Sequence, residues 1–399
     1  MKTVHPYAEL IQKSTKFLLL IPVTLFLVLT MMGQANAQKI ITFDAPGAGT
    51  GPYQGTGCFA YTDCSVLIND EGTITGYFLD ANNVFHGFVR SPEGKFTSFD
   101  APGADLTPGD YNGTTPGAIN DAGVITGQYY DVNGGTHGFL RSPNGAFTTF
   151  DVTGSPIGTT NPRALNLLGE VVGFSVDQNG AFRPFLRRLD GTFATWSVPG
   201  ECDTPNTTGC YGSAGVGINV FGTVSGGYED NSGNFVDHGL LRSANGTLTN
   251  YNDPDAGNGL YQGTGCPGCS RPINLWGAVA GYYIDGNNLV HGYLRSPWGQ
   301  FTTFDAPGDL LYGLGCYADC SMGLNDSGAI TGIYLDANNV FHGFLRSPKG
   351  KFTSFDAPGA DLTPGDYNGT FPVSINDQGI ITGYYIDVKN VSHGFLLLP

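Results

Sequence analysis

Charged residues are scarce in this chain. They make up 13% of its 399 residues, and 18 Lys and Arg stand against 34 Asp and Glu, which gives a formal net charge of −16. A protein that binds nucleic acid needs basic charge to displace counterions, so this balance excludes nucleic acid as a partner. Cysteine is also rare, with eight residues, so disulfides cannot replace a hydrophobic core here.

The chain also lacks the common catalytic motifs. It has no Gly-x-Ser-x-Gly turn, no His-Glu-x-x-His motif and no phosphate-binding loop with its lysine. Helical periodicity is absent outside the first residues. Hydrophobic residues nevertheless make up 40% of the chain and aromatic residues 12%, which is enough for a large core.

One long apolar run, from Phe17 to Met32, occurs in the whole chain. It follows a basic start and ends before Ala35-Asn36-Ala37. This order predicts a secretory signal peptide over residues 1–37. An uncleaved membrane anchor is the alternative, although the run is short for a membrane span. We therefore expect a secreted, periplasmic or cell-surface protein without a membrane span in the mature chain.

A unit of about 51 residues fills the rest of the chain in seven copies. Its clearest copy, from Leu67 to Asp100, contains Ile-Asn-x-x-Gly-x-Ile-Thr-Gly and, later, His-Gly-Phe. The Asn of this motif marks every copy: Asn69, Asn120, Asn166, Asn219, Asn274, Asn325 and Asn376. Six copies carry the His, at His86, His137, His238, His291, His342 and His393, and the third copy has Arg183 instead. We interpret the repeated His as a scaffold residue that bonds to a neighbouring loop.

Each copy predicts four short β-strands joined by tight turns. In the clearest copy, Asp70-Glu71-Gly72 forms a turn in which Gly accepts a positive φ. Asn82-Asn83 favours a hairpin, because Asn tolerates left-handed dihedral angles. Aromatic and β-branched residues occur on both faces of the middle strands, which indicates sheets packed on both sides.

The two ends of the mature chain complement each other. It starts with Ile41-Thr42-Phe43-Asp44, a fourth strand without the preceding three, and it ends with a third strand from His393 to Pro399. A ring of four-stranded blades closes in this way, when the first strand completes the last blade. The sequence therefore predicts an all-β fold, a seven-bladed β-propeller that forms one domain over residues 38–399. An open solenoid of the same repeats and two stacked sandwiches are the alternatives.

A propeller would place alternate connections on opposite faces. One face would hold the Asp-x-Gly turns, and the other would hold the Asp-x-Asn hairpins, the long loops between repeats and every Cys. We call the second face the acidic loop face. Its hairpin carboxylates are Asp80, Asp131, Asp177, Asp285, Asp336 and Asp387. Because loops carry function and negative fields attract cations, this face is the first candidate surface.

The Cys residues lie in four local pairs on the acidic loop face. The pairs are Cys58 with Cys64, Cys202 with Cys210, Cys266 with Cys269, and Cys316 with Cys320. In an exported chain, such pairs predict disulfides that pin loops. A zinc site made by the last two pairs, and a redox pair at 266–269, are the alternatives.

An acidic loop occurs twice in near-identical form, after Phe99 and after Phe355. Its oxygens could gather around Ca²⁺, which prefers six to eight oxygen ligands. The candidate ligands are Asp100, Asp105, Asp110, Asn112, Asp356, Asp361, Asp366 and Asn368. Turn formation by the Asp residues is the alternative. Ca²⁺ is the one cofactor that the sequence indicates.

Tyr residues recur beside Asp and Asn in the same loops. An aromatic face stacks on a sugar ring while amides and carboxylates bind its hydroxyls, so these residues suit carbohydrate binding. The candidates are Tyr53, Tyr111, Tyr261, Tyr312 and Tyr367. Packing within the loops is the alternative.

A catalytic site is harder to nominate. Glycoside hydrolysis needs two facing carboxylates about 5–10 Å apart, and many repeated Asp pairs could meet this condition. A single site must arise where the repeats differ. If the protein is an enzyme, the non-repeated acids Glu201, Asp203 and Asp319 are therefore the first to test.

The repeated motif resembles the extracellular HAF-repeat family of bacteria over essentially the whole mature chain. The family motif is His-Ala-Phe, often followed by Leu-Trp. Here Gly replaces Ala, as in His86-Gly87-Phe88, and Arg90 stands where the family has Trp. The third copy departs further, with Arg183-Pro184-Phe185. The resemblance implies export and a propeller-like β fold, and it implies no established activity.

The sequence favours a secreted, non-enzymatic binding module, because it lacks a unique catalytic set. We expect the acidic, disulfide-pinned loop face to bind a glycan or an extracellular protein, with the chain as a monomer. A secreted carbohydrate-active hydrolase or lyase with a carboxylate cluster on the same face is one alternative. A structural envelope or matrix protein is the other.

Overall fold

The structure, a computed structural model, describes residues 39–57, 65–109, 111–202, 211–266, 269–307, 321–366 and 368–399. In these ranges every regular element is a β-strand, which confirms the all-β prediction. No helix in them is long and apolar enough to cross a membrane. The predicted signal peptide lies outside the described residues.

Antiparallel four-stranded sheets dominate, as the repeat predicts. Within the described residues, four sheets have four strands each and a fifth has three. Two of the four-stranded sheets are β7 (Thr114–Ile119), β8 (Ile125–Tyr130), β9 (Thr136–Arg141) and β10 (Phe147–Phe150), and β11 (Thr160–Leu165), β12 (Val171–Val176), β13 (Phe182–Arg187) and β14 (Phe193–Thr195). The other two are β15 (Ser213–Ile218), β16 (Val224–Glu229), β17 (Asp237–Arg242) and β18 (Leu248–Tyr251), and β22 (Gly323–Leu324), β23 (Ile330–Leu335), β24 (Phe341–Arg346) and β25 (Phe352–Phe355). The three-stranded sheet is β19 (Val279–Ile284), β20 (Val290–Arg295) and β21 (Phe301–Phe304).

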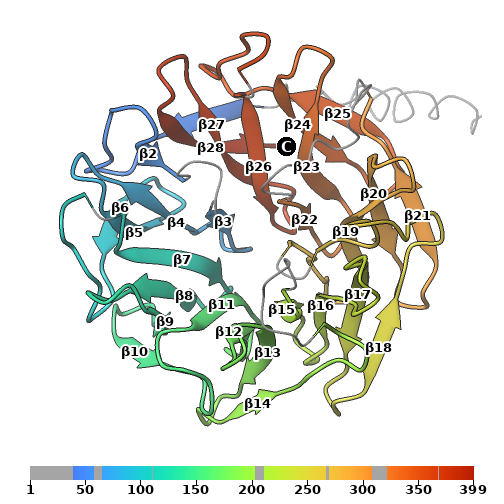
Figure 1. The fold of residues 1–399 in the computed structure, drawn as a ribbon. Helices are drawn as coiled ribbons and strands as arrows, with labels where there is room; N and C mark the ends of the chain where they lie inside the picture. Colours follow the sequence, from blue (N-terminus) through green and yellow to red (C-terminus); the bar gives the residue numbers. More distant parts are fainter. Residues whose placement is uncertain are drawn as a thin grey trace, which may run out of the picture. The chain divides into compact units, whose positions relative to one another are not determined.

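The remaining sheet has nine strands, because β2 (Gly55–Thr56) joins two four-stranded stretches. One stretch is β3 (Val66–Ile68), β4 (Ile74–Leu79), β5 (Phe85–Arg90) and β6 (Phe96–Phe99); the other is β26 (Thr370–Ile375), β27 (Ile381–Ile386), β28 (Ser392–Leu398) and β1 (Lys39–Phe43). β1 pairs antiparallel with β28, with Thr42 opposite Phe395. The first and the last described strands therefore lie in one sheet (Figure 1).

The turns form as the residue types predict. Gly72 adopts φ 77° after β3, and Asn83 adopts φ 61° in the hairpin between β4 and β5. Asp80 holds that hairpin, because its Oδ1 accepts the N–H of Asn82 at 2.8 Å and the N–H of Val84 at 2.9 Å. A side chain that bonds its own backbone in this way is a turn former.

The repeated Asn links each sheet to the next. Asn69 accepts the N–H of Thr73 at 2.8 Å, which closes its own turn, and its Nδ2 donates to the carbonyl of Asn120 at 3.0 Å. The same donation runs from Asn120 to Asn166, and then to Asn219, Asn274, Asn325 and Asn376 in order. Asn376 donates back to the carbonyl of Asn69 at 3.1 Å. Seven side chains thus form one cycle of hydrogen bonds.

Buried aromatic rings fill the space between neighbouring sheets. Phe139 of β9 is fully buried and meets Phe99 of β6 edge-on, with ring centroids 6.2 Å apart. Phe395 meets Phe355 in the same way at 6.1 Å. The guanidinium of Arg141 lies 4.7 Å from the ring centroid of Phe99, a cation–π contact. The core therefore lies between sheets, on both faces of the middle strands.

Candidate functional site

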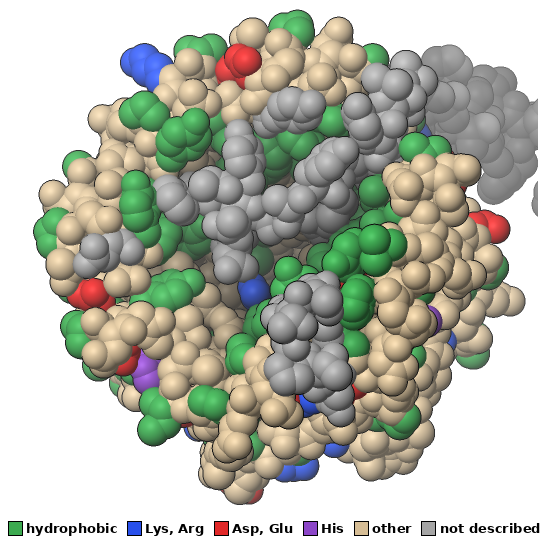
Figure 2. Space-filling view, in the orientation of Figure 1, with side chains coloured by type: hydrophobic (Ala, Val, Ile, Leu, Met, Phe, Trp, Pro, Cys, Tyr) green, Lys and Arg blue, Asp and Glu red, His purple; other side chains and the backbone are tan. Residues whose placement is uncertain are grey.

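A central cavity of about 570 Å³ is lined by the first strands of successive sheets. The contributing strands, β3, β7, β11, β15, β22 and β26, surround a common centre in Figure 1. In the face seen in Figure 2 the surface is hollowed at its centre, and hydrophobic side chains surround the hollow. The repeat thus places a few residues from each of these six strands around one cavity.

β-Bulges decide which side chains reach this cavity. The register shifts between Pro116 and Ala118, between Pro162 and Ala164, between Gly215 and Gly217, and between Pro372 and Ser374. A bulge inserts one extra residue and re-aims its side chain. The inserted residues are Gly117, Arg163, Val216 and Val373, and all four line the cavity.

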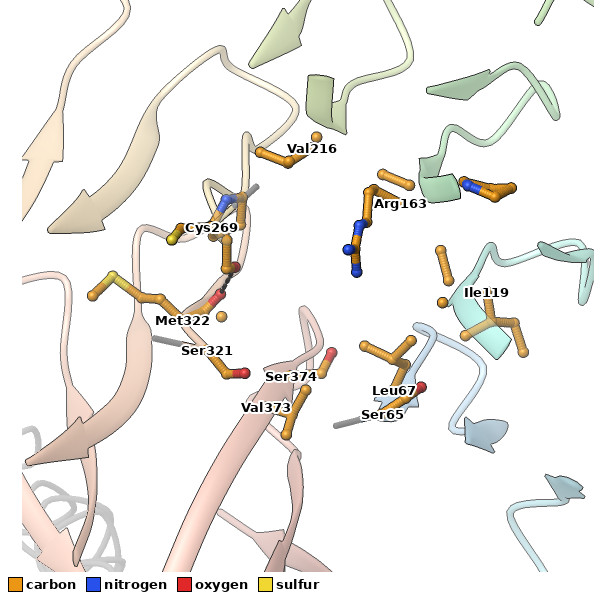
Figure 3. A pocket seen from close by; sticks show the side chains of 18 of the residues that line it. Ser65, Leu67, Ile119, Arg163, Val216, Cys269, Ser321, Met322, Val373 and Ser374 are labelled. Carbon is orange, nitrogen blue, oxygen red and sulfur yellow. Dashed lines mark hydrogen bonds between the residues drawn. The ribbon is translucent and has the colours of Figure 1, made fainter. Parts of the chain in front are cut away.

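Arg163 is the one charged side chain among the described lining residues. Figure 3 shows its guanidinium extended into the cavity, and the guanidinium carbon lies 5.2 Å from the ring centroid of Phe174. The other described lining side chains are uncharged, and Ser65, Gln128 and Ser374 are among the polar ones. Because no carboxylate is among them, the described part of the cavity holds no acid–base pair.

The predicted Tyr residues lie exposed on loops that reach across to the neighbouring sheet. Tyr53, Tyr111 and Tyr261 are 54%, 41% and 45% exposed. Their backbone N–H groups donate to the hairpin carbonyls of Asn390, Asn83 and Asn234, at 2.6, 3.2 and 3.0 Å respectively. Tyr312 and Tyr367 lie outside the described residues.

All three described Tyr residues adopt left-handed backbone dihedrals. Their φ angles are 63° at Tyr53, 54° at Tyr111 and 56° at Tyr261. A bulky residue rarely has a positive φ, and such strain clusters at ligand-binding positions. The same conformation at three equivalent positions, each next to a hairpin Asn, makes a repeated surface feature.

The hairpin carboxylates of the acidic loop face are engaged in their own turns. Asp131 accepts the N–H groups of Gly135 and Asn133 at 2.8 and 2.9 Å. These two backbone N–H groups lower the pKa of Asp131 to about 2. The carboxylate is therefore ionised at neutral pH, and its first role is to form the turn.

A His lies between the hairpin Asp and a second polar side chain in six repeats, and this second side chain is an Asp in five of them. Its Nδ1 lies 2.6–2.9 Å from an Asp oxygen, or from Asn252 in the case of His238. Its Nε2 lies 3.3–3.8 Å from the hairpin Asp. The ring also stacks on an aromatic side chain, as His86 does on Phe78 with centroids 5.2 Å apart. These contacts agree with the interpretation of the His as a scaffold residue.

The loops predicted to bind Ca²⁺ hold their carboxylates with protein donors. Asp105 accepts the N–H of Thr107 at 3.0 Å, the hydroxyl of Thr107 at 2.6 Å and the amide of Asn112 at 3.0 Å. Asp361 makes the same three bonds to Thr363 and Asn368. Asp100 and Asp356 instead bond to the repeated His.

Two predicted Ca²⁺ ligands of these loops, Asp110 and Asp366, remain. Asp366 has no hydrogen bond through its side chain among the described residues, and Asp110 lies outside them. In the described part of the chain, no group of three or more His, Cys, Asp or Glu side chains could hold a metal ion. The Ca²⁺ prediction for these loops remains a prediction.

Glu201, the candidate acid nominated by its lack of repetition, is buried. Its Oε1 accepts a hydrogen bond from Nη1 of Arg183 at 2.7 Å, and Nε of Arg183 donates to Asp177 at 2.9 Å. Arg183 thus takes the place of the bridging His between two carboxylates. The other two nominated acids, Asp203 and Asp319, lie outside the described residues.

One predicted disulfide is present in the described residues. Cys266 and Cys269 are bonded, with Cα atoms 5.2 Å apart. Cys202 is also disulfide-bonded, and its predicted partner Cys210 lies outside the described residues. Cys58, Cys64, Cys316 and Cys320 also lie outside the described residues. The bond at 266–269 fits an oxidising compartment.

Sequence reasoning misses four buried charged side chains around β16 and β17. Glu229, Asp237, Asp253 and Arg271 are 3%, 5%, 2% and 1% exposed. Burial raises the pKa of Glu229 to about 7, although its carboxylate accepts the N–H of Tyr211 at 2.7 Å. Burial also raises the pKa values of Asp237 and Asp253.

A comparison of the repeats contains the signal for two of these residues. Glu229 stands where the clearest copy has Leu79, and Asp237 stands where it has Phe85. Aligned copies therefore show two charged residues at core positions of one sheet. Buried charges at positions that other copies fill with uncharged residues mark an asymmetric site.

Comparisons with known proteins support the fold. No family model matches the chain, and no curated protein matches its sequence. The chain is similar to the solved structure of virginiamycin B lyase from Staphylococcus aureus, with 14% identity and a TM-score of 0.54 over 91% of this chain and 100% of that one. A streptogramin B lyase matches with 15% identity and a TM-score of 0.50 over 90% of this chain and 98% of that one. At such identities the likeness shows a propeller-like fold and leaves the function to the site.

Proposed function

We propose that this chain is a secreted, non-enzymatic binding module built as a closed, seven-bladed β-propeller. Seven Asn residues form one hydrogen-bond cycle, in which Asn376 returns to Asn69. The pairing of β1 with β28 supports closure by the N-terminal strand. Export through the predicted signal peptide and membership of the HAF-repeat family belong to the same proposal.

The binding surface is the acidic loop face, and the ligand is a glycan. The observation that carries this proposal is the repeated exposed Tyr with a left-handed backbone, at Tyr53, Tyr111 and Tyr261. The flat ring can stack on a sugar, and the hairpin amides beside it can bind hydroxyl groups. Equivalent sites at several positions would give avidity toward a repetitive polysaccharide.

A glycan array with purified residues 38–399 tests this proposal. A variant with Tyr53, Tyr111 and Tyr261 each replaced by Asn removes the rings, and Asn tolerates the left-handed backbone. We expect at least a tenfold loss of glycan binding in this variant. Trp298→Ala, which removes an 87% exposed ring on another turn, is the control and should bind as the wild type does.

Two results would count against glycan binding at the Tyr residues. One is the absence of binding to any glycan by protein shown to be folded, which would favour a protein partner or a structural role. The other is unchanged binding by the triple Tyr variant. Running the array with Ca²⁺ and again with EDTA also tests the Ca²⁺ requirement predicted for the Asp105 and Asp361 loops.

The carbohydrate-active hydrolase or lyase is the second candidate function. The buried Glu201, ion-paired with Arg183, is the nominated acid that the structure describes. The described lining of the central cavity carries no carboxylate, which favours binding over catalysis there. Turnover of a polysaccharide by the purified protein, abolished by Glu201→Gln, would replace the binding proposal with the enzymatic one.

A further inference from the structure

A second cavity, of about 270 Å³, lies on the loop side of β17 and β18. The residues that line it are Val236, Asp237, Asn252, Asp253, Pro254, Ala256, Gly257, Asn258 and Gly263. Two of them, Asp237 and Asp253, carry a carboxyl group. This cavity is separate from the central one and from the exposed Tyr residues.

Both carboxylates are buried, and each keeps an oxygen without a partner. Asp237 is 5% exposed and Asp253 is 2% exposed. Among the described residues, Oδ1 of Asp237 and Oδ2 of Asp253 have no hydrogen-bond donor. The other oxygen of Asp253 accepts the N–H of Asp255 at 3.0 Å. A buried carboxylate oxygen without a donor or a counter-ion is strongly unfavourable.

The chain itself shows that the fold does not require these carboxylates. Gly263 pairs in parallel with Asp237, as Gly55 pairs with Ser392 in the equivalent place. The hydroxyl of Thr264 accepts the N–H of Asp253 at 2.9 Å, as the hydroxyl of Thr56 accepts the N–H of Ala45 at 2.9 Å. Ser and Ala therefore occupy the same backbone positions as the two Asp residues.

The equivalent place also satisfies its polar groups without charge. Ser392 donates its hydroxyl to the carbonyl of Thr56 at 2.8 Å. An ionised Asp237 cannot make such a donation, and the carbonyl of Thr264 instead accepts a hydrogen bond from Arg271 at 2.7 Å. The substitution of two carboxylates into this setting thus has a cost that the fold alone does not explain.

Charge balance indicates what the cavity binds. Glu229 lies opposite Asp237 in the β16–β17 ladder, and Arg271, the buried cation of this region, donates to the carbonyls of Thr264 and Cys266. The buried groups of this region thus include three acids, Glu229, Asp237 and Asp253, and one cation. A bound divalent cation would favour the ionised form of the acids, which burial alone disfavours.

We propose that the cavity binds a divalent cation of the Ca²⁺ type, with Asp237 and Asp253 as its charged ligands. Ca²⁺ is a hard ion that accepts carboxylate, amide and backbone oxygens in flexible geometry. Asn252, Pro254, Ala256, Gly257 and Asn258 line the same cavity and can supply neutral oxygens. The site differs from the loops that contain Asp105 and Asp361, whose carboxylates have protein donors.

The test compares wild-type residues 38–399 with the double variant Asp237→Ser and Asp253→Ala. These are the residues that the chain uses at positions 392 and 45, so the variant should fold. Calorimetry with CaCl₂ should show one site in the wild type, with a Kd of about 10⁻⁴–10⁻³ M, as in other extracellular modules. The double variant should lose at least tenfold in affinity.

Thermal unfolding in CaCl₂ and in EDTA gives a second readout. Saturating Ca²⁺ should raise the midpoint of the wild type by about 2–4 °C, because only the folded chain binds the ion. The control, Asp255→Asn, removes an exposed carboxylate on the same loop that does not line the cavity and should keep both the affinity and the shift.

Two outcomes would overturn the cation site. One is a wild-type midpoint and heat signal that do not respond to Ca²⁺, Mg²⁺ or Mn²⁺. The other is equal Ca²⁺ binding by the double variant and the wild type, which would return Ca²⁺ to the Asp105 and Asp361 loops. If the double variant does not fold, the single variant Asp253→Ala replaces it, with the same expected loss. None of these measurements uses a glycan, so their outcome is independent of glycan binding at the Tyr residues.

Discussion

A protonated imidazole fits the place of His86 better than a neutral one. His86 lies 2.8 Å from Asp100 on one side and 3.7 Å from Asp80 on the other. In the third repeat the same place holds Arg183, a permanent cation, between Asp177 and Glu201. The replacement of His by Arg, rather than by a neutral residue, indicates that this place requires positive charge between two carboxylates.

Stability should therefore decrease as the pH rises above neutrality. The hydrogen bond that His86 donates to Asp100 raises the pKa of His86, and the bonds to Asp356 and Asp44 raise the pKa values of His342 and His393 in the same way. A pKa that is higher in the folded state gives stabilisation that is complete below the unfolded value of about 6.5 and is lost as the pH rises through the folded value. The free energy of unfolding in urea should fall between pH 6 and pH 9.

A triple variant with His86, His342 and His393 replaced by Gln separates this effect from other titrating groups. Gln keeps a hydrogen-bond donor but cannot take up a proton. The difference in unfolding free energy between wild type and variant should shrink as the pH rises. A difference that is constant from pH 6 to pH 9 would mean that folding does not change the pKa of the three imidazoles.

The Gly of the repeated His-Gly-Phe motif is required by an aromatic ring. A Cβ on Gly138 would lie 2.4 Å from the ring of Phe150, the fourth-strand aromatic of the same sheet. Gly138→Ala should therefore cost about 1–3 kcal/mol of stability through overpacking. Gly286→Ala is the matched control, because nothing lies within 4 Å of the added Cβ, and its thermal midpoint should stay close to that of the wild type.

This contact also accounts for Gly where the His-Ala-Phe motif, which the repeat resembles, has Ala. A Cβ on Gly87 would lie 2.5 Å from the ring of Phe99. A repeat with Ala would need a smaller or displaced residue on its fourth strand. Unchanged stability of Gly138→Ala would show that the Phe150 ring can move aside at little cost.

At the scale of the strand and its turns, one Asn performs two tasks. Asn120 accepts the N–H of Val124 at 2.9 Å, which closes the turn between β7 and β8, and donates to the carbonyl of Asn166 in the next sheet at 3.0 Å. Asn120→Ala leaves the N–H of Val124 without its partner, and the carbonyl of Asn166 keeps only the N–H of Gly169. The loss should be about 2–4 kcal/mol in unfolding free energy.

A hairpin Asn provides the comparison for this variant. Asn133 is exposed and bonds only within the turn of Asp131, so Asn133→Ala should change the free energy of unfolding by less than about 0.5 kcal/mol. Chemical denaturation of both variants gives the two values. Equal losses in the two variants would show that the bond between sheets contributes nothing beyond the turn.

The strands and turns are well predicted from sequence because they depend on local chemistry. Asp-x-Gly and Asn-Asn require particular dihedral angles, and Gly72 and Asn83 adopt them. The all-β architecture and its four-stranded sheets follow from the repeat. The bulge that aims Arg163 into the central cavity is not predicted, because it depends on how neighbouring strands pair.

The candidate site is predicted less well, and for a physical reason. Exposed Tyr and loop Asp residues are visible in the sequence, but whether an Asp bonds to a Thr hydroxyl, as Asp105 does, depends on the folded loop. The sequence does not mark Asp237 and Asp253 as a pair, because the two residues resemble the many turn-forming Asp residues. Only their burial, which follows from the position in the sheet, distinguishes them.

At the scale of the whole molecule, the repeats share their work unequally. The Asn residues of the cycle and the aromatic residues between sheets are repeated around the centre. In contrast, Arg163, Glu229, Asp237 and Arg271 each occur in one repeat only. The repeated Asn and aromatic residues thus maintain the scaffold, whereas residues that occur in one repeat can form a single, unrepeated site. The two proposed sites differ in this respect, because the Tyr sites are repeated and the cation site is unique.

Closure by the first strand should be a large part of the stability of the whole molecule. β1 pairs with β28 along its full length, from Lys39 opposite Leu398 to Phe43 opposite Gly394, and Asp44 bonds to His393 at 2.8 Å. A chain that starts at Ala45 loses these bonds and the burial of the Phe43 ring. At about 1 kcal/mol for each hydrogen bond and about 2 kcal/mol for the ring, the loss should exceed roughly 5 kcal/mol.

This loss is comparable to the total stability of many domains, so residues 45–399 should unfold at a much lower temperature than residues 38–399 and should associate through the exposed edge of β28. A synthetic peptide of residues 39–44 should bind the shortened chain and restore the midpoint, whereas the same peptide with Phe43→Ser should not. Thermal unfolding and size-exclusion chromatography measure both effects. If the shortened chain is as stable and as monomeric as the longer one, the β1–β28 pairing does not stabilise a closed ring. The open solenoid then becomes the better description of these repeats.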